Sequence, residues 1–289
     1  MPRHFLIRRI KSPMIRTLEA ALALQVIFHV LILESDMPKW CPATVVEKKI
    51  WTDGLFTIRI SASDVTPFVP GQFLQLGVFP EGQDGDEAKL INRPYSVASP
   101  HGDELDFFIV LVEEGELTPR LWKLQEGSPL QVSQRAAGSF TLKKTPDAET
   151  LWLVATGTGL APYIAMLRTD EPWESYQNIV VVHGVRHYAD LAYTEELRAF
   201  EETHAGRFKL IQALTREEAD GTLQGRIPSL FDSGEIEKAT GFDCRSDNSS
   251  VLLCGNPAML DTMEEVLAKR AMKRHRSKSP GQIVLERYW

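Results

Sequence analysis

Two glycine-containing turns each follow an apolar stretch; the first has the chemistry to hold a phosphate, and the second lies at a strand end of the kind that binds ligands in open α/β sheets. The stretch 151–155 (LWLVA) leads into Thr156-Gly157-Thr158-Gly159, and the stretch 250–254 (SVLLC) leads into Gly255-Asn256-Pro257. Glycine lets the backbone approach a phosphate, and the start of a following helix favours negative charge. The first turn is not a strict G-x-G-x-x-G fingerprint. On its own it leaves a nucleotide site and an ordinary tight turn both open, just as Cys254 could be a buried thiol.

Aromatic and cationic side chains occur at two further places, in the tetrapeptide RPYS and at the end of the chain. Arg93 has the geometry to hold a phosphate with two hydrogen bonds, while Tyr95 offers a flat face and Ser96 a small donor. Tyr and Ser are also commonplace in strands. The chain ends Glu286-Arg287-Tyr288-Trp289. Two aromatic residues directly after an expected core strand indicate that they cover something flat.

Two arginines follow expected strands, and a third lies ten residues after the second. Arg186 stands in HGVR, Arg216 in LTRE and Arg226 in GRIP. Arginine accommodates a 2′-phosphate where an NAD site would use an acidic residue. These residues favour NADPH, although surface arginines are common. A separate basic run, residues 269–278, contains Lys269, Arg270, Lys273, Arg274, Arg276 and Lys278. Such a run is either a solvated face or a surface that steers acidic partners.

The pattern of the first half predicts a small antiparallel β-barrel. Strands are expected at 43–50, 55–61, 73–79, 95–98, 105–112 and 129–132, with a short helix at 119–124. Short strands separated by turns at this spacing are typical of such barrels. The polar segment 143–149 reads as a linker.

From residue 150 the pattern changes to alternating strands and helices. Strands are expected at 151–155, 178–183, 208–214, 250–254 and 283–288, and helices at 162–168, 193–203 and 257–272. This alternation predicts an α/β fold with a parallel sheet. We therefore expect two domains, residues 37–146 and 147–289.

Composition narrows the classes of function. The chain has 289 residues and a net charge of −7, which disfavours a nucleic-acid binder. Its three cysteines are too few for an iron–sulfur cluster held by four thiolates of one chain. They also exclude a disulfide scaffold and favour a reducing compartment, for which we expect the cytoplasm. We expect no metal site.

Residues 1–36 differ from the rest of the chain. They hold five basic and three acidic side chains, a net +2 that leaves −9 for the remainder. Their apolar run 20–33 is shorter than the roughly 20 residues needed to span a bilayer. An upstream start codon before Met37, a targeting segment and a structural helix are the three alternatives. We expect the segment to lie outside the fold.

In their order along the chain, the motifs resemble those of the plant-type ferredoxin–NADP(+) reductase family. Within it the chain is similar to the bacterial ferredoxin/flavodoxin–NADP(+) reductases, which extend one aromatic residue beyond the Tyr. The resemblance covers about residues 37–289. It rests on WTDGLF, RPYS, GELTPRL, ATGTGLAP, HGVR, GRIPSLFDSGE and CGNPAM. It implies an FAD-binding barrel, an NADP-binding α/β domain, and electron exchange between NADP(H) and ferredoxin or flavodoxin.

The resemblance also implies roles for individual residues. FAD contacts are implied for Arg93, Tyr95, Ser96, Ile109, Val110, Leu111, Glu116, Leu117, Thr118, Thr158 and Trp289. NADP contacts are implied for Gly157, Gly159, Arg186, Arg216, Arg226 and Gly255. Ser96, Cys254, Glu286 and Tyr288 would form the catalytic site. In it Tyr288 covers the flavin, Trp289 stacks on the adenine and Cys254 packs against nicotinamide. Glu286 would stabilise intermediates or relay a proton, its alternative being a solvated carboxylate.

Partners and rival functions follow from the same residues. Acidic carriers, ferredoxin or flavodoxin, would dock near residues 269–278, with no nucleic-acid or membrane partner and a monomeric enzyme. The rivals are a flavin or quinone reductase on the same scaffold and a non-catalytic subunit without flavin. A third rival is a nucleic-acid or membrane binder that uses the basic run.

Overall fold

The computed structural model describes residues 39–80 and 89–288. Trp40–Trp289 form one compact unit. Segment 1–36 and Trp289, with the predictions attached to them, lie outside the described residues. Within the described part, no helix is both long and apolar enough to cross a membrane.

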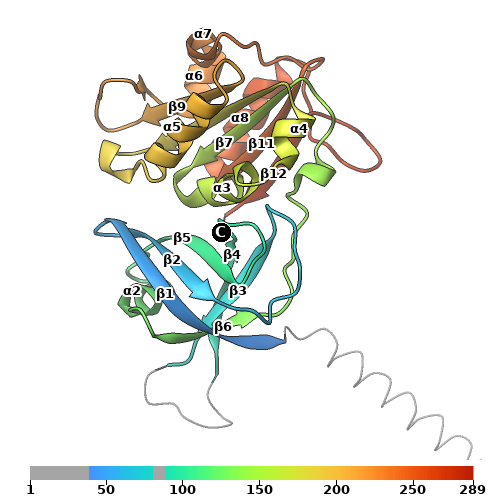
Figure 1. Ribbon diagram of the computed structural model, residues 1–289. Coiled ribbons are helices and arrows are strands. Elements are labelled where there is room, and N and C mark those ends of the chain that lie inside the picture. Colours follow the sequence, from blue (N-terminus) through green and yellow to red (C-terminus); the bar gives the residue numbers. More distant parts are fainter. Residues whose placement is uncertain (1–38, 81–88, 289) are drawn as a thin grey trace, which may run out of the picture. The chain divides into compact units, whose positions relative to one another are not determined.

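The first sheet is antiparallel, in the order β4-β3-β6-β1-β2-β5, and forms the predicted barrel (Figure 1). Along β1, Cys41, Ala43 and Val45 are buried and alternate with exposed residues, as expected for a strand with one face on the core. A bridge between Val97 and Phe107 joins the two edges of the sheet. The barrel elements are β1 (Trp40–Thr52), β2 (Leu55–Ser61), β3 (Phe73–Val78), β4 (Ile91–Ser96), β5 (Glu104–Val110), α2 (Thr118–Lys123), β6 (Pro129–Ser133) and η1 (Leu142–Lys144).

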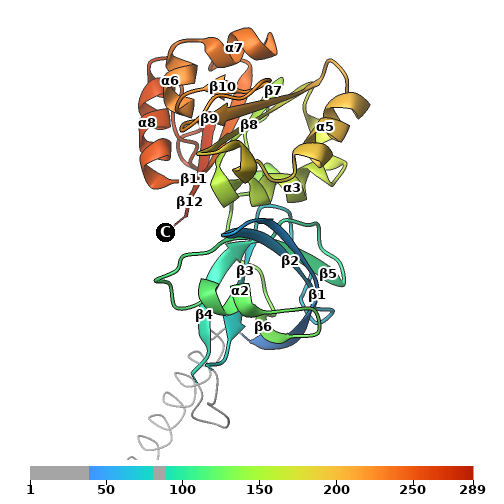
Figure 2. The same cartoon turned by 90° about the vertical axis from the view of Figure 1, so that its left-hand side faces the viewer.

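The second sheet is parallel, in the order β10-β9-β8-β7-β11-β12, and carries helices on both faces (Figures 1 and 2). Its strands are β7 (Thr150–Thr156), β8 (Asn178–Val185), β9 (Phe208–Leu214), β10 (Leu223–Gln224), β11 (Ser249–Gly255) and β12 (Ile283–Arg287). Its helices are η2 (Gly157–Leu160), α3 (Ala161–Leu167), α4 (Glu171–Ser175), η3 (Tyr188–Asp190), α5 (Thr194–Thr203), α6 (Ile227–Asp232), α7 (Glu235–Thr240) and α8 (Pro257–Ala268). We call this part the α/β lobe.

The unbroken apolar run of β7 is explained by this sandwich, because successive side chains of a strand point to opposite faces. Leu151 and Leu153 pack in one core cluster with residues of α3 and α5. Trp152 and Val154 pack in the other, with residues of α6 and α8. The first cluster also contains barrel residues such as Phe108, so apolar packing continues across the junction between barrel and lobe.

The predicted fold class is confirmed, while several boundaries differ. Strand β4 begins at Ile91 and ends at Ser96, so the predicted strand 95–98 was placed too late. The predicted glycine turn is a short 3₁₀ helix, η2. The helix predicted for 257–272 ends at Ala268, and the backbone turns left-handed at Ala271 (φ 58°). The predictions also lacked α4, α6 and α7, whose five or six residues are too short for a clear helical period.

Candidate active site

The parallel sheet changes its winding direction between β7 and β11. From β7 the chain adds β8, β9 and β10 on one side, and then returns to place β11 and β12 on the other. Open α/β sheets bind ligands at such a switch point, beyond the carboxyl ends of the strands. The turn η2 follows β7 there, and Gly255 ends β11 beside it.

Glycines let the two turns meet closely. A Cβ on Gly159 would stand 2.5 Å from the Cys254 carbonyl oxygen. Gly255 has φ +125°, and a Cβ there would collide with Thr156. The Thr156 hydroxyl accepts a hydrogen bond from the Asn256 amide at 3.0 Å. These contacts fix the two turns against each other as one cradle, which places the predicted Gly157, Gly159 and Gly255 together.

A buried histidine of β8 contacts the backbone of this cradle. The His183 side chain on β8 is fully buried, and its Nε2 lies 3.1 Å from the Gly157 carbonyl oxygen. Burial lowers the pKa of His183 to about 4, so the neutral ring donates from Nε2 to that carbonyl. In the HGVR motif, the sequence predicted a functional role only for Arg186. The signal for His183 was a polar residue in the apolar run NIVVVH.

The four predicted catalytic residues are brought together from both sheets. Ser96 ends β4 of the barrel, and its hydroxyl donates to the Glu286 carboxylate of β12 at 3.2 Å. Cys254 is paired in register with Glu286 across β11 and β12. The Tyr288 amide donates to the Gly255 carbonyl at 3.2 Å, which holds Tyr288 beside the end of β11 that carries Cys254. We call these four residues the Glu286 cluster.

Burial dominates the electrostatics of the Glu286 cluster. It raises the pKa of Glu286 to about 7, opposed by the hydrogen bond from Ser96. It also raises the pKa of the fully buried Cys254 thiol well above its ordinary value. The Cys254 thiol is therefore neutral near pH 7, which disfavours a thiolate nucleophile. Glu286 can hold or release a proton near neutral pH.

On the barrel, the residues predicted to contact FAD lie on β4, at the end of β5 and around the start of α2. Arg93 is exposed and pairs with Glu116 at 2.7 Å. The Thr118 hydroxyl closes the loop before α2 through the Val112 amide and carbonyl, both at 2.9 Å. Leu117 and Ile109 are buried, and Val110 is half-buried on β5 next to Leu111. Burial raises the pKa of Tyr95 to about 12. Thr158 lies in η2, which contacts β5.

The three predicted NADP arginines gather at one edge of the lobe. The Arg216 amide donates to the Arg186 carbonyl at 3.0 Å, and Arg226 follows β10, which pairs with β9. All three side chains are exposed. Among the residues that the structure describes, none of the three forms an ion pair, whereas the neighbouring Glu217 faces His187 at 3.8 Å. This edge therefore offers cations to an incoming anion.

The basic run lies at the opposite end of β12 from the Glu286 cluster. It precedes Ile283, which pairs with Val251 at the start of β11. At about 3.3 Å per residue, the length of β12 separates the two ends by roughly 13 Å. Part of the charge is also paired: Lys269 with Asp232, Arg270 with Glu237, and Arg274 with Glu264. The Arg274 side chain nevertheless extends toward the end of β12, because its partner Glu264 also lies 3.8 Å from Arg287.

The donor set fits two nucleotide cofactors. Cationic side chains on the barrel and the lobe suit phosphates, the glycine cradle admits a close backbone approach, and the Glu286 cluster joins the two. No group of three or more His, Cys, Asp or Glu side chains in residues 39–80 and 89–288 is arranged to hold a metal ion.

Similarity to known proteins extends over nearly the whole described chain. A flavodoxin/ferredoxin–NADP reductase of Shigella flexneri is 39% identical over 255 residues, covering 88% of this chain and 100% of that protein. The protein of the same name from Escherichia coli (strain K12) is 38% identical with the same coverage. The chain belongs to the flavodoxin/ferredoxin–NADP reductase family.

Structural similarity agrees with this family assignment. A ferredoxin NADP+ reductase from Neisseria gonorrhoeae, solved with bound FAD and NADP, superimposes with a TM-score of 0.80 at 28% identity. The match covers 87% of this chain and 99% of that one. The family profile described as "Oxidoreductase NAD-binding domain" matches residues 153–265, within the α/β lobe.

Proposed function

We propose that this protein is a ferredoxin/flavodoxin–NADP(+) reductase that uses FAD. It exchanges a hydride with NADP(H) and single electrons with ferredoxin or flavodoxin. The observation that carries this proposal is the meeting of the Ser96 and Glu286 side chains at 3.2 Å, in a chain that matches reductases of this family over their full length. When bound, FAD supplies the redox chemistry, and the protein supplies binding and orientation.

On the flavin side, we assign residues 37–146 as the FAD-binding domain. Arg93 suits the pyrophosphate, because a guanidinium holds phosphate oxygens with two hydrogen bonds. Glu116 keeps Arg93 oriented until the phosphate arrives. Tyr95 provides a half-buried aromatic face, and the main chain of Ile109, Val110 and Leu111 provides polar groups beside it. Leu117 and Thr118 start α2 close to the phosphates, and Thr158 reaches the flavin from η2.

At the reacting centre, residues of the Glu286 cluster orient the rings and manage a proton. The Ser96 hydroxyl would donate near N5 of a bound flavin. Glu286, with a pKa of about 7, can hold a proton and pass it through Ser96. Tyr288 would cover one face of the flavin ring and would have to move aside to admit nicotinamide. Cys254 shapes that space as a neutral side chain.

On the nicotinamide side, we assign residues 147–289 as the NADP-binding domain. The cradle of Gly157, Gly159 and Gly255 accepts the pyrophosphate, and Arg216 and Arg226 accept the 2′-phosphate, with Arg186 beside them. Each charge-assisted hydrogen bond contributes roughly 1.5–3 kcal/mol. Two arginines therefore give NADPH a large advantage over NADH.

We further propose how the enzyme meets its partners. The exposed cations of the basic run, Lys273, Arg276 and Lys278, steer an acidic carrier toward this side of the lobe. Their distance from the Glu286 cluster suits steering better than direct contact at the flavin. We propose that the enzyme acts as a monomer. The three cysteines are each buried, which suits the reducing cytoplasm.

A kinetic comparison tests this function. The holoprotein should reduce cytochrome c with NADPH only when ferredoxin or flavodoxin is added. Equal turnover with free flavin or a quinone, with no carrier effect, would instead identify a small-acceptor reductase. The R216A/R226A double variant should weaken NADPH binding about 100-fold or more and leave NADH nearly unchanged. An equal loss for both nucleotides would remove the 2′-phosphate assignment.

A further inference from the structure

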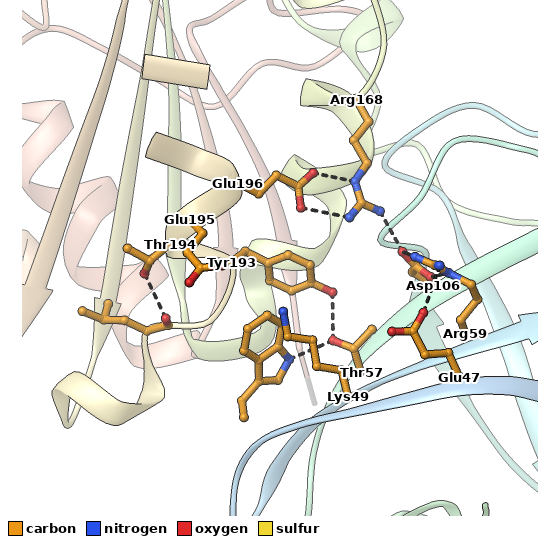
Figure 3. A pocket seen from close by; sticks show the side chains of 12 residues that line it. Glu47, Lys49, Thr57, Arg59, Asp106, Arg168, Tyr193, Thr194, Glu195 and Glu196 are labelled. Atoms are coloured by element: carbon orange, nitrogen blue, oxygen red, sulfur yellow. Dashed lines mark hydrogen bonds and ion pairs between the residues drawn. The ribbon is translucent and has the colours of Figure 1, made fainter. Parts of the chain in front are cut away.

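A second polar cluster joins the barrel to the α/β lobe, away from the Glu286 cluster. It lines a cavity of about 460 Å³ (Figure 3). At its centre is Asp106 of β5, with 3% of its surface exposed. Arg168 of the lobe donates to the Asp106 carboxylate at 2.7 Å and to the Ala98 carbonyl at 3.0 Å. Arg59 donates to the same carboxylate from within the barrel at 2.7 Å. We call Arg59, Asp106, Arg168 and Glu196 the Asp106 cluster.

Arg168 is itself held in a fixed direction. Glu196 of α5 accepts two hydrogen bonds from its guanidinium, at 2.7 and 3.0 Å. The planar group therefore makes four hydrogen bonds, two within the lobe and two across to the barrel. Such a fork fixes direction as well as distance.

Arg168 is close in the chain to the glycine cradle and contacts the segment that follows Ser96, so it is linked to both halves of the proposed hydride-transfer site. Arg168 directly follows the last residue of α3. The first residue of α3 directly follows η2, which contains Gly157 and Gly159. All seven residues of α3 are buried, so the helix acts as a rigid rod about 10 Å long. Ala98, which Arg168 grips, comes two residues after Ser96. One helix therefore links the glycine cradle to the segment that carries Ser96.

A second contact crosses the junction beside the first. The Tyr193 hydroxyl lies 2.8 Å from the Thr57 hydroxyl of β2, which also accepts from Trp51 at 2.9 Å. Tyr193 adopts a left-handed backbone (φ 59°), which is costly for a bulky residue. Its ring packs edge-on against Phe108 of the barrel, with centroids 5.2 Å apart. The junction is thus held by specific bonds as well as by apolar packing.

We propose that Arg168 is a positioning residue for hydride transfer: by gripping Asp106 and the Ala98 carbonyl, it sets the glycine cradle at a fixed distance from Ser96. The inference rests on the proposed function. A misplacement of about 1 Å between reacting groups costs up to about 100-fold in rate. Arg168 is not among the residues assigned to FAD or NADP(H), so its loss should lower the rate of hydride transfer while the affinities for both stay the same.

The Asp106 cluster offers a matched control. R59Q removes a guanidinium from the same carboxylate, but Arg59 and Asp106 both belong to the barrel. R168Q removes the partner that crosses the junction. R168K keeps the charge and loses the fork, so it should recover part of the rate.

The experiment is anaerobic stopped-flow reduction of the FAD-loaded protein by NADPH, together with FAD and NADPH dissociation constants for each variant. We expect R168Q to slow flavin reduction about 10- to 100-fold, R168K to slow it less, and R59Q to stay within about twofold of the wild type. Both dissociation constants should remain within about twofold. Hydrogen exchange of residues 97–103 should rise in R168Q only, with or without cofactors.

The outcomes separate this inference from the function on which it rests. If wild-type protein is not reduced by NADPH, the proposed function fails. If NADPH reduces the flavin of the wild type, but reduces that of R168Q as fast as that of R59Q, only the positioning role is overturned. Slow reduction in R168Q accompanied by an equal loss of FAD affinity would likewise overturn it, as a general structural effect. If R168Q does not fold, the comparison of R168K with R59Q decides in the same way.

Discussion

Two carboxylates, Asp106 and Glu286, face the junction between the barrel and the α/β lobe, and their hydrogen-bond partners differ. Asp106 receives hydrogen bonds from two guanidinium groups. Glu286 receives one from a neutral hydroxyl, and burial raises its pKa to about 7. Full pairing suits a carboxylate that holds the parts together. Sparse pairing suits one that exchanges a proton. The same type of side chain therefore serves structure or chemistry according to its partners.

Removing the Asp106 charge should have the largest effect on stability. D106N leaves two partly buried guanidinium groups without their carboxylate, and breaking a buried ion pair costs about 3 kcal/mol. Urea unfolding of D106N against wild type measures this loss. The E286Q variant is the matched control at the other carboxylate, and near pH 7 it should be no less stable than the wild type. Equal losses in both variants would erase the distinction between the two carboxylates.

The Glu286 carboxylate should also give stability a dependence on pH. Its pKa is about 7 in the folded chain and 4.5 ordinarily. The folded state therefore favours the protonated form, and its stabilising contribution is complete below about pH 4.5 and lost as the pH rises through 7. The stability of E286Q relative to wild type should increase by about 2–3 kcal/mol between pH 5 and pH 8. Unfolding midpoints across that range measure it.

His183 makes this difference measurement necessary. Its pKa of about 4 lies below its ordinary 6.5, so it contributes stability that is present above 6.5 and lost as the pH falls toward 4. The wild-type curve mixes these opposite trends, and subtracting it from the E286Q curve isolates Glu286. A difference that is flat with pH would contradict the raised pKa.

The smallest effect should come from Ser96. Its hydroxyl stabilises the ionised Glu286, so S96A should move the midpoint of that pH dependence upward by about half a unit to one unit. The S96A/E286Q double variant, compared with E286Q, provides the control. A midpoint shift in the opposite direction would mean that Ser96 does not donate to Glu286.

The fold could be predicted because its signals are local, whereas the Glu286 cluster was predicted only through the resemblance of the ordered motifs to a known family. A strand followed by T-G-T-G, or a strand ending in Cys254-Gly255, can be recognised within a few residues. Arg168 and Asp106 are 62 residues apart, and each looks like an ordinary surface charge until the fold places them together. Docking of an acidic carrier near the basic run stays a prediction, because a run of charges in the sequence shows neither which side chains are paired nor what they meet.

Anaerobic mixing of the FAD-loaded protein with NADPH tests the central claim most directly. We predict that flavin absorbance near 450 nm, roughly the position typical of flavins, is bleached by NADPH much faster than by NADH. It should then recover when oxidised ferredoxin or flavodoxin is added. Two results would contradict this function: a purified protein that retains no flavin, or a bound flavin that stays oxidised after NADPH is added.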